Sequence, residues 1–328
     1  MIGRTFVTLG LWLLAASAWS QAAPEAPVAP EVTVVGQRPG PGLWKISNGE
    51  NVLWVFGTYS PLPVKMQWRS HEVEAILARS QEFISPPIAT PDIGKLQIVS
   101  MLPFAFGVNK LPDGKTLRDV LPADVYARWQ PLKQKYLGTD DDIERLRPIF
   151  AADALYWAVL KEAGLENTRS VRETINRLVK QNKLKVTSPE FKFAIDNPRK
   201  ALRDFKTSSL EDGDCFAKTL ERLEKDIDGL RLRANAWAKG DLEAIQKLNF
   251  ADREGACTSA LLSSSAFKDQ PGFQSIDARI KDMWLAAVDK ALAANKSTFA
   301  VLGMKDILDP KGYVAALKEK GYVVEQPE

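Results

Sequence analysis

The sequence has 328 residues, with 44 lysines and arginines against 41 aspartates and glutamates, which gives a formal net charge of +3. A phosphate backbone would meet no concentrated positive field on such a chain, so nucleic acid is not an expected partner. The two cysteines and the single histidine, His71, exclude a zinc finger and a CxxC redox motif.

The N-terminus is typical of an export signal. Arg4 precedes an apolar run from Phe6 to Ala16, and Ala16-Ser17-Ala18 and Ser20-Gln21-Ala22 each offer a small-residue cleavage site. The apolar run is about half the length that a membrane-spanning helix needs, although an uncleaved anchor is the alternative. We therefore expect residues 1–22 to be a signal peptide. The mature chain is expected to be periplasmic or secreted, without a transmembrane segment.

Residues 23–42 are rich in proline and small residues, which cannot bury a core and favour an extended tether. The prolines are Pro24, Pro27, Pro30, Pro39 and Pro41. From residue 43 to residue 328 the chain has the length and apolar content for a substantial core. We predict that this part forms one folded domain.

The domain is predicted to open with a β-hairpin, because Leu43–Ile46 and Val52–Phe56 flank the turn signal Asn48-Gly49. The second run is apolar at every position, which indicates a central strand buried on both faces. It ends at Gly57-Thr58-Tyr59-Ser60. Ligands of α/β sheets bind beyond the carboxyl ends of strands, so this segment is a candidate site.

Helical spacing follows at Val73, Ile76 and Leu77, before a short strand at Phe83-Ile84. From Pro122 to about Leu248 the pattern is mainly helical and contains two apolar stripes. The first stripe is Ile143, Leu146, Ile149, Phe150, Leu155 and Leu160, and the second is Phe216, Leu220, Leu223, Ile227 and Leu230. We interpret both stripes as helix faces packed in the core.

Two further groups of side chains have structural interpretations. We expect Trp44, Trp54, Trp157 and Trp284 to lie in the core rather than to stack on sugars. The basic residues Arg169, Arg172, Arg177, Lys180, Lys183 and Lys185 are interpreted as the solvated face of a helix. Contact with an anionic envelope polymer or with lipid head groups is the alternative for this face.

The C-terminal elements resemble the N-terminal ones in their order. A helix is predicted over Ile276–Ala294, followed by the strand Thr298–Leu302, which ends at Gly303-Met304-Lys305-Asp306. A last helix at Pro310–Lys320 and a strand at Tyr322–Glu325 complete the chain. Both ends of the domain thus carry a strand, then Gly-x-x-x, then a helix.

Cys215 and Cys257 both lie in the part of the chain expected to be exported, where an oxidising environment favours their pairing. We predict a disulfide that closes a 43-residue loop. Two unpaired buried thiols are the alternative.

The chain resembles the TraB/GumN family, which includes the Tiki-type metal-dependent peptidases. The N-terminal resemblance lies in Leu43-Trp44-Lys45 and in Leu53–Thr58. The C-terminal resemblance lies in Phe299–Gly303 and in Gly321–Glu325. It implies an α/β (α+β) fold with a central mixed β-sheet from two related halves and a large helical middle region. Each half would place a Gly-x-x-His loop beside a shared cleft.

The family's two motif histidines correspond to Ser60 and Asp306 here, while Gly57, Thr58 and Gly303 are kept as cleft backbone. A catalytic metal needs about three protein ligands and an open position. We therefore expect no cofactor, with a divalent metal such as Mn or Zn as the alternative.

The site residues also have structural interpretations. Asp306 or Asp309 is expected to cap the helix predicted from Pro310. Ser60 as a nucleophile would need a base, and His71 is expected to be solvated at the start of a helix. Lys305 would serve as a base only if it were buried.

These observations favour a non-catalytic exported member of the family, an envelope binding or accessory module with a polysaccharide-related role suggested by the family name. An envelope protein, a peptide or a polysaccharide is the expected partner. One alternative is an active peptidase-like hydrolase that depends on metal or on Ser60. Another is a purely structural protein that binds its partner through the proline-rich tether.

Overall fold

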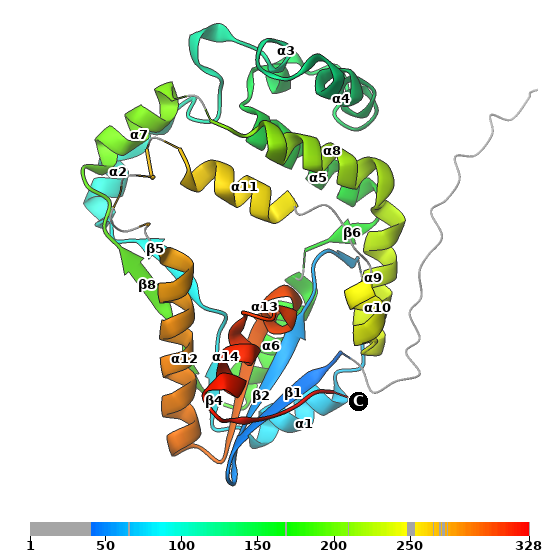
Figure 1. The fold of residues 1–328 in the computed structure, drawn as a ribbon, viewed down its shortest axis with the longest axis vertical. Helices are drawn as coiled ribbons and strands as arrows, with labels where there is room; N and C mark the ends of the chain where they lie inside the picture. Colours follow the sequence, from blue (N-terminus) through cyan, green and yellow to red (C-terminus); the bar gives the residue numbers. More distant parts are fainter. Residues whose placement is uncertain are drawn as a thin grey trace, which may run out of the picture. The chain divides into compact units, whose positions relative to one another are not determined.

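Six strands form the central sheet, in the order β10-β1-β2-β9-β4-β7 (Figure 1). The structure, a computed structural model, describes residues 41–64, 66–167, 169–208, 210–247, 253–264, 266–268, 270, 273 and 275–327. The sheet strands are β1 (Leu43–Asn48), β2 (Asn51–Thr58), β4 (Glu82–Ile84), β7 (Lys185–Thr187), β9 (Ser297–Gly303) and β10 (Val323–Glu325). β1 is antiparallel to both of its neighbours, and β2, β9, β4 and β7 are parallel to one another. The predicted mixed α/β fold is confirmed.

The predicted N-terminal hairpin is also confirmed. Asn48 pairs with Asn51, and Gly49 takes a positive φ of 62° in the tight turn between them. β2 lies inside the sheet, between β1 and β9, and its Leu53 and Phe56 side chains are fully buried. This explains the continuous apolar run at the sequence level, because a central strand is covered on both faces.

Helices cover the sheet and bury its apolar side chains. They are α1 (His71–Arg79), α6 (Arg169–Gln181), α12 (Ile276–Ala294), α13 (Met304–Leu308) and α14 (Tyr313–Glu319). α12 packs against β2, β4 and β9, and α13 follows β9 directly and also contacts β2. Trp44, Trp284 and Phe299 are among the fully buried side chains of this core. The helix and strand predicted over 276–302 are confirmed.

A second hydrophobic core is formed by helices of the middle region. Its elements are α3 (Leu117–Val120), α4 (Ala123–Tyr136), η2 (Asp141–Arg145), α5 (Pro148–Glu162), α8 (Gly213–Lys225) and α9 (Ile227–Lys239), and the short helix η1 (Pro112–Gly114) precedes them. Trp129 packs on Phe216 at 5.3 Å between ring centroids. α9 joins the two cores, since Leu230 belongs to the second and Trp237 to the first.

The remaining elements connect these parts. They are α2 (Lys95–Ala105), α7 (Pro198–Thr207), α10 (Leu242–Lys247), α11 (Arg253–Leu262), β3 (Leu62–Pro63), β5 (Ile88–Pro91), β6 (Leu165–Glu166) and β8 (Glu190–Phe193). β3 pairs with β6 in an antiparallel sheet, and β5 pairs with β8 in a parallel one. The strands β6, β7 and β8 interrupt the region that the sequence indicated as mainly helical.

Each of the two apolar stripes is divided between elements. Ile143 lies in η2 and Leu146 is its C-cap, whereas α5 begins at Pro148, a residue suited to the first turn of a helix. The second stripe is divided at Asp226, which separates α8 from α9. The expectation of one continuous helix face was wrong in both cases, although the stripe residues lie largely in the core.

Three smaller expectations need correction. The last helix begins at Tyr313 rather than at Pro310, because α13 already occupies the segment directly after β9. Trp157 is 41% exposed, so it is not a core residue, and Trp54 is only half-buried. Lys183 and Lys185 lie beyond the end of α6, so they are not part of the predicted basic helix face.

The disulfide is confirmed, because the Cys215 and Cys257 sulfur atoms lie 1.96 Å apart and join α8 to α11. Within the described part of the chain, every helix is too short or too polar to cross a lipid bilayer. The predicted signal peptide lies outside the described residues, as does the predicted tether apart from residues 41 and 42.

Candidate functional site

The candidate site lies at the carboxyl ends of two neighbouring parallel strands. The register of β2 and β9 pairs Thr58 with Gly303, so the chain leaves the sheet at one edge after both residues. Ser60 and Asp306 follow these ends, and both are exposed. The Thr58 hydroxyl donates a hydrogen bond to the carbonyl of Leu302 at 3.1 Å and ties the two strand ends together.

Gly57 is required at the end of β2 because other side chains fill the space above it. A Cβ atom at position 57 would lie 2.3 Å from the Met304 sulfur and 3.0 Å from the Trp44 ring. The Trp237 indole N–H, from α9, donates to the Gly57 carbonyl at 2.7 Å. The glycine therefore allows α13 to pack against the strand end, and α9 is tied to the same residue through its backbone carbonyl.

Asp306 lies in the first turn of α13, three residues after its N-cap residue Gly303. The backbone N–H of Gly303 favours the charged form of the Asp306 carboxylate. A Cβ atom at position 303 would lie 3.0 Å from the Asp306 carboxylate oxygen, so glycine makes room for this contact. Partial desolvation raises the pKa of Asp306, although the Gly303 bond opposes the rise. The predicted cap of a helix starting at Pro310 was wrong, because that helix begins at Tyr313 with Gly312 as its N-cap residue, and Asp306 lies within α13 instead.

Asp309 and Tyr313 complete the loop after α13. The Asp309 carboxylate accepts from the backbone N–H of Lys311 at 2.8 Å. Desolvation raises the pKa of Tyr313 to about 12, and the negative charges of Asp306 and then Asp277 add to this rise. The Tyr313 ring also packs edge-on against Trp284 at 5.3 Å. The phenol therefore stays protonated beside the Asp306 carboxylate at neutral pH.

Tyr59 and Arg233 form a buried polar contact that the sequence did not predict. The Arg233 Nε donates to the Tyr59 hydroxyl at 3.0 Å, and its guanidinium also pairs with the Asp226 carboxylate. Arg233 is fully buried, and Tyr59 is 8% exposed. Arg233 lies four residues before Trp237, so both side chains project from one face of α9. The sequence signal that could have indicated this contact is an arginine four residues before a tryptophan on an apolar helix face.

Further aromatic and basic side chains surround the Tyr156 ring in the middle region. The guanidinium of Arg253 stacks over this ring at 4.1 Å, and that of Arg222 lies 5.7 Å from it. Arg222 binds the Glu254 carboxylate at 2.7 and 2.8 Å. Burial raises the pKa of both Tyr59 and Tyr156. This group links α5, α8 and α11 by stacking and charge pairing.

A divalent metal fits the strand-end residues poorly. The Ser60 hydroxyl is a weak ligand when neutral, and the Asp306 carboxylate already accepts from Gly303. The nearby Arg233 adds a buried positive charge. Among the residues that the structure describes, no three histidine, cysteine, aspartate or glutamate side chains come together as a metal-binding group.

Neither of the other candidate bases is buried. His71 is exposed at the first position of α1, as predicted. Lys305 is exposed in α13, so the burial that would make it a base is missing.

Val171, Ile175 and Leu178 of α6 are buried, which leaves its arginines and lysines on the outer face.

A buried glutamate lies at the opposite end of the parallel strands. Glu82, at the start of β4, is 4% exposed and accepts from Thr187, from Lys185 at 3.0 Å and from Asn295 at 2.8 Å. Burial disfavours its charge, but these three hydrogen bonds outweigh that effect and lower its pKa. We interpret Glu82 as a connection between β4, β7 and α12 rather than as part of the candidate site.

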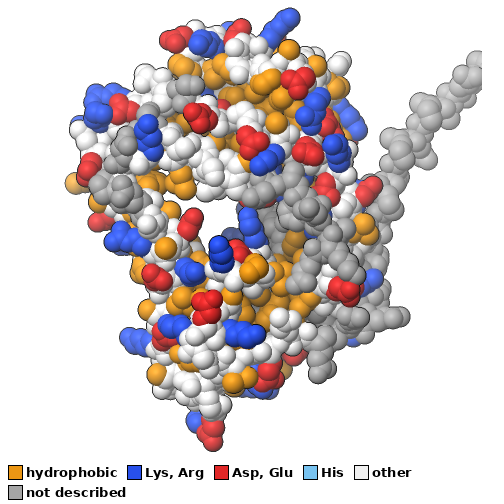
Figure 2. All heavy atoms as spheres, viewed as in Figure 1, with side chains coloured by type: hydrophobic (Ala, Val, Ile, Leu, Met, Phe, Trp, Pro, Cys, Tyr) orange, Lys and Arg blue, Asp and Glu red, His pale blue; other side chains and the backbone are white. Residues whose placement is uncertain are grey.

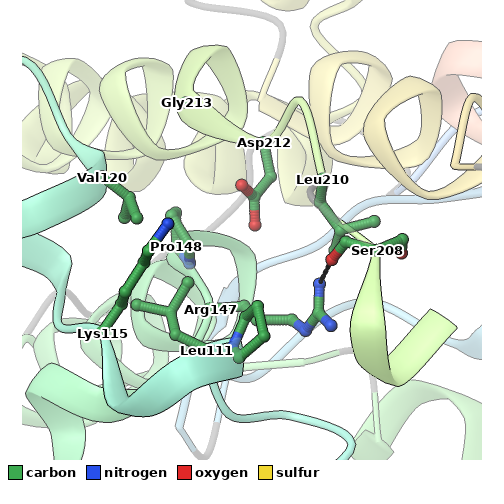
Figure 3. A pocket seen from close by; sticks show the side chains of 10 residues that line it. Leu111, Lys115, Val120, Arg147, Pro148, Ser208, Leu210, Asp212 and Gly213 are labelled. Carbon is green, nitrogen blue, oxygen red and sulfur yellow. Dashed lines mark hydrogen bonds between the residues drawn. The ribbon is translucent and has the colours of Figure 1, made fainter.

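A cavity of about 140 Å³ lies in the middle region and contains none of the predicted site residues (Figure 3). Arg147, which is buried, donates to the carbonyls of Ser208, Phe205 and Lys206 and so caps the end of α7. Asp212, also buried, accepts from the Ile149 N–H at 2.9 Å and caps the start of α5. The two buried charged groups of this cavity therefore hold helix ends in place.

The fold and the strand-end geometry define an α/β protein with a candidate site beyond two adjacent parallel strands. The chain belongs to the TraB/PrgY/gumN family, whose model matches residues 42–326. A comparison with curated proteins and one with solved structures gave no match.

Proposed function

We propose that this TraB/PrgY/gumN family protein is an exported, non-catalytic binding or accessory module of the cell envelope. The observation that carries the proposal is the structural use of the polar groups at the strand ends. Asp306 lies in the first turn of α13, where the Gly303 N–H favours its charged form, and Tyr59 is held by Arg233. Groups that maintain the fold in this way are poorly placed to bind a metal or to transfer a proton.

The exposed groups that remain at this edge suit a hydroxyl-rich or peptide ligand. Ser60 presents a hydroxyl, and Asp306 keeps carboxylate oxygen that can accept further hydrogen bonds. Both are groups that bind sugar hydroxyls or peptide N–H groups. We therefore propose an envelope polysaccharide or peptide as the ligand of this edge.

An active hydrolase is the competing function, with Asp306 as a metal ligand or Ser60 as a nucleophile. Metal analysis of the purified protein, together with hydrolysis assays on peptide libraries, separates the two. We expect no stoichiometric Mn, Co or Zn and no hydrolysis. Stoichiometric metal, with activity lost in Asp306→Ala, would overturn the non-catalytic proposal.

A second experiment asks whether the strand ends keep the geometry of a metal site. We expect the double variant Ser60→His with Asp306→His to bind Zn or Mn more tightly than the wild type, as measured by isothermal titration calorimetry. The single variants serve as controls, since one added histidine supplies too few ligands. Equal metal binding by all four proteins would show that residues 60 and 306 do not face a shared site.

Ligand binding itself is tested by titrating envelope polysaccharide and peptide fractions against the protein. Ser60→Trp should weaken binding at least tenfold, because the indole fills the strand-end surface. Lys225→Trp is the matched control, at a side chain that is 71% exposed near the end of α8. Loss of binding in the control as well, or in neither variant, would place the ligand elsewhere.

A further inference from the structure

Helix α2 exposes an unusual amount of apolar surface. Four apolar side chains on one face of this helix are exposed to solvent. They are Leu96 (89% exposed), Val99 (63%), Leu102 (62%) and Phe106 (82%), of which Phe106 is the C-cap residue. No residue of α2 is buried. A contiguous apolar stripe of this kind marks a contact with a partner or a membrane.

The other side of α2 rests on α7, which supplies basic side chains. The Arg199 guanidinium donates to the Ser100 hydroxyl at 3.3 Å near the middle of α2. The Lys206 ammonium donates to the Phe106 carbonyl at 2.9 Å at its end. Two cations are therefore fixed beside the apolar stripe, one of them at the backbone carbonyl of Phe106.

The helix pair α2 and α7 carries a net positive charge. Over residues 92–110 and 192–207 there are seven lysines and arginines against three aspartates, a net charge of +4, whereas the whole chain carries +3. The cations are all exposed, and they are Lys95, Lys110, Lys192, Arg199, Lys200, Arg203 and Lys206. The aspartates are Asp92, Asp196 and Asp204, the last of which pairs with Lys200 at 2.6 Å. In Figure 2, basic side chains gather at the upper left, where Figure 1 places α7.

We propose that α2 and α7 form a docking surface for an anionic lipid bilayer. The apolar stripe of α2 enters the boundary between head groups and acyl chains, and the neighbouring cations bind lipid phosphates. A second copy of the chain fits less well, because a two-fold contact would bring the same basic surface onto itself. A soluble anionic polymer would use the cations but leave the apolar stripe in water. This surface is separate from the strand-end site.

The test is co-sedimentation of the full chain with vesicles of phosphatidylcholine alone or mixed with phosphatidylglycerol. We expect binding to the anionic vesicles that weakens as salt is added, because salt screens the attraction between the cations and the lipids. Residues 1–42 are the same in every variant, so differences between variants report on the docking surface. Equal binding to both vesicle types would overturn the electrostatic part of the proposal.

Two variants separate the apolar and the basic contributions. Leu96→Gln with Val99→Gln and Phe106→Gln should lower the vesicle partition coefficient at least tenfold. Arg199→Gln with Arg203→Gln should lower it on the order of tenfold for anionic vesicles only. Circular dichroism and urea unfolding check that both variants keep the fold.

Matched controls change similar side chains elsewhere. Leu232→Gln alters a leucine that is 57% exposed on α9, and Arg177→Gln with Lys180→Gln removes two cations from α6. Both controls should bind like the wild type. The proposal fails if the α6 variant loses as much binding as the α7 variant, or if the α2 variant binds unchanged. It also fails if the wild type is a dimer that the α2 variant dissociates, or if it binds soluble anionic polysaccharide as tightly as vesicles.

Discussion

At the end of β9, two opposing effects act on the Asp306 carboxylate. The bond from the Gly303 N–H stabilises its charged form, as expected for an acidic residue in the first turn of a helix. Desolvation by neighbouring groups disfavours the charge more strongly, so the pKa of Asp306 lies above its ordinary value of 3.8. The folded protein therefore binds this proton more tightly than the unfolded chain.

This balance predicts a pH dependence of stability. A raised folded-state pKa gives stabilisation that is present below about pH 3.8 and is lost as the pH rises through the folded value. Asp306→Asn keeps an oxygen acceptor for Gly303 but does not titrate. Relative to this variant, the wild type should therefore lose stability between acidic pH and neutrality. Urea unfolding of both proteins across this range measures the difference, and a change in the opposite direction would contradict the desolvation argument.

Sequence reasoning at the residue scale located the candidate positions but not their contacts. Ser60 and Asp306 were named from the family resemblance, and the register of β2 with β9 pairs Thr58 with Gly303, the strand ends that precede them. The partner of Tyr59 was missed, because Arg233 is 174 residues away along the chain. Local spacing carries no information about a contact between residues so far apart.

At the scale of elements, α9 connects the helical middle region to the strand-end site. Arg233 reaches Tyr59, and Trp237 reaches the carbonyl of Gly57. Removing a buried arginine leaves its partners without their hydrogen bonds in a poorly solvated place. The position of α9 therefore depends on this pair of side chains.

We predict that Arg233→Met lowers the free energy of unfolding by about 3–5 kcal/mol, because Tyr59 and Asp226 lose their buried partner. Lys225→Met is the control, since Lys225 pairs with Glu221 on an exposed surface and its loss should change stability by less than about 0.5 kcal/mol. Urea unfolding followed by tryptophan fluorescence measures both. A small effect of Arg233→Met would show that the contact with Tyr59 contributes little.

The boundaries of elements were predicted well where local signals are strong. Ile276–Ala294 is helical as predicted, and the Asn-Gly turn lies where the hairpin signal indicated. Boundaries failed where a short element follows another without a loop. α13 begins directly after Gly303, so the last helix begins at Tyr313 rather than at the predicted Pro310.

At the scale of the whole molecule, the disulfide ties α11 to the helical core. Cys215 is fully buried in α8, and its Cα lies 4.6 Å from that of Cys257. Arg222 reaches Glu254, and Arg253 reaches Asp153 at 2.7 Å, so charge pairs flank the covalent bond. The loop that the bridge closes includes all of α9.

Reduction of this bridge should lower the free energy of unfolding by about 4 kcal/mol in the chain-entropy model, since a closed loop of 43 residues restricts the unfolded chain. Urea unfolding with and without reductant measures the change. Cys215→Ala with Cys257→Ala is the control, and reductant should leave its unfolding unchanged. Intact mass spectrometry should show two additional hydrogens after reduction of the wild type. Two free thiols in the native protein would contradict the bridge.

The sequence by itself determined the α/β class, the hairpin, the strand at residues 298–302 and the pairing of two distant cysteines. These features follow from periodicity, turn chemistry and the small number of cysteines, which act locally or leave one choice. The tertiary structure alone decided that β2 and β9 lie side by side, that Arg233 holds Tyr59, and that the apolar stripe of α2 stays in solvent beside the cations of α7. Such contacts join segments far apart in the chain, and their energies depend on burial and charge that only the folded arrangement creates.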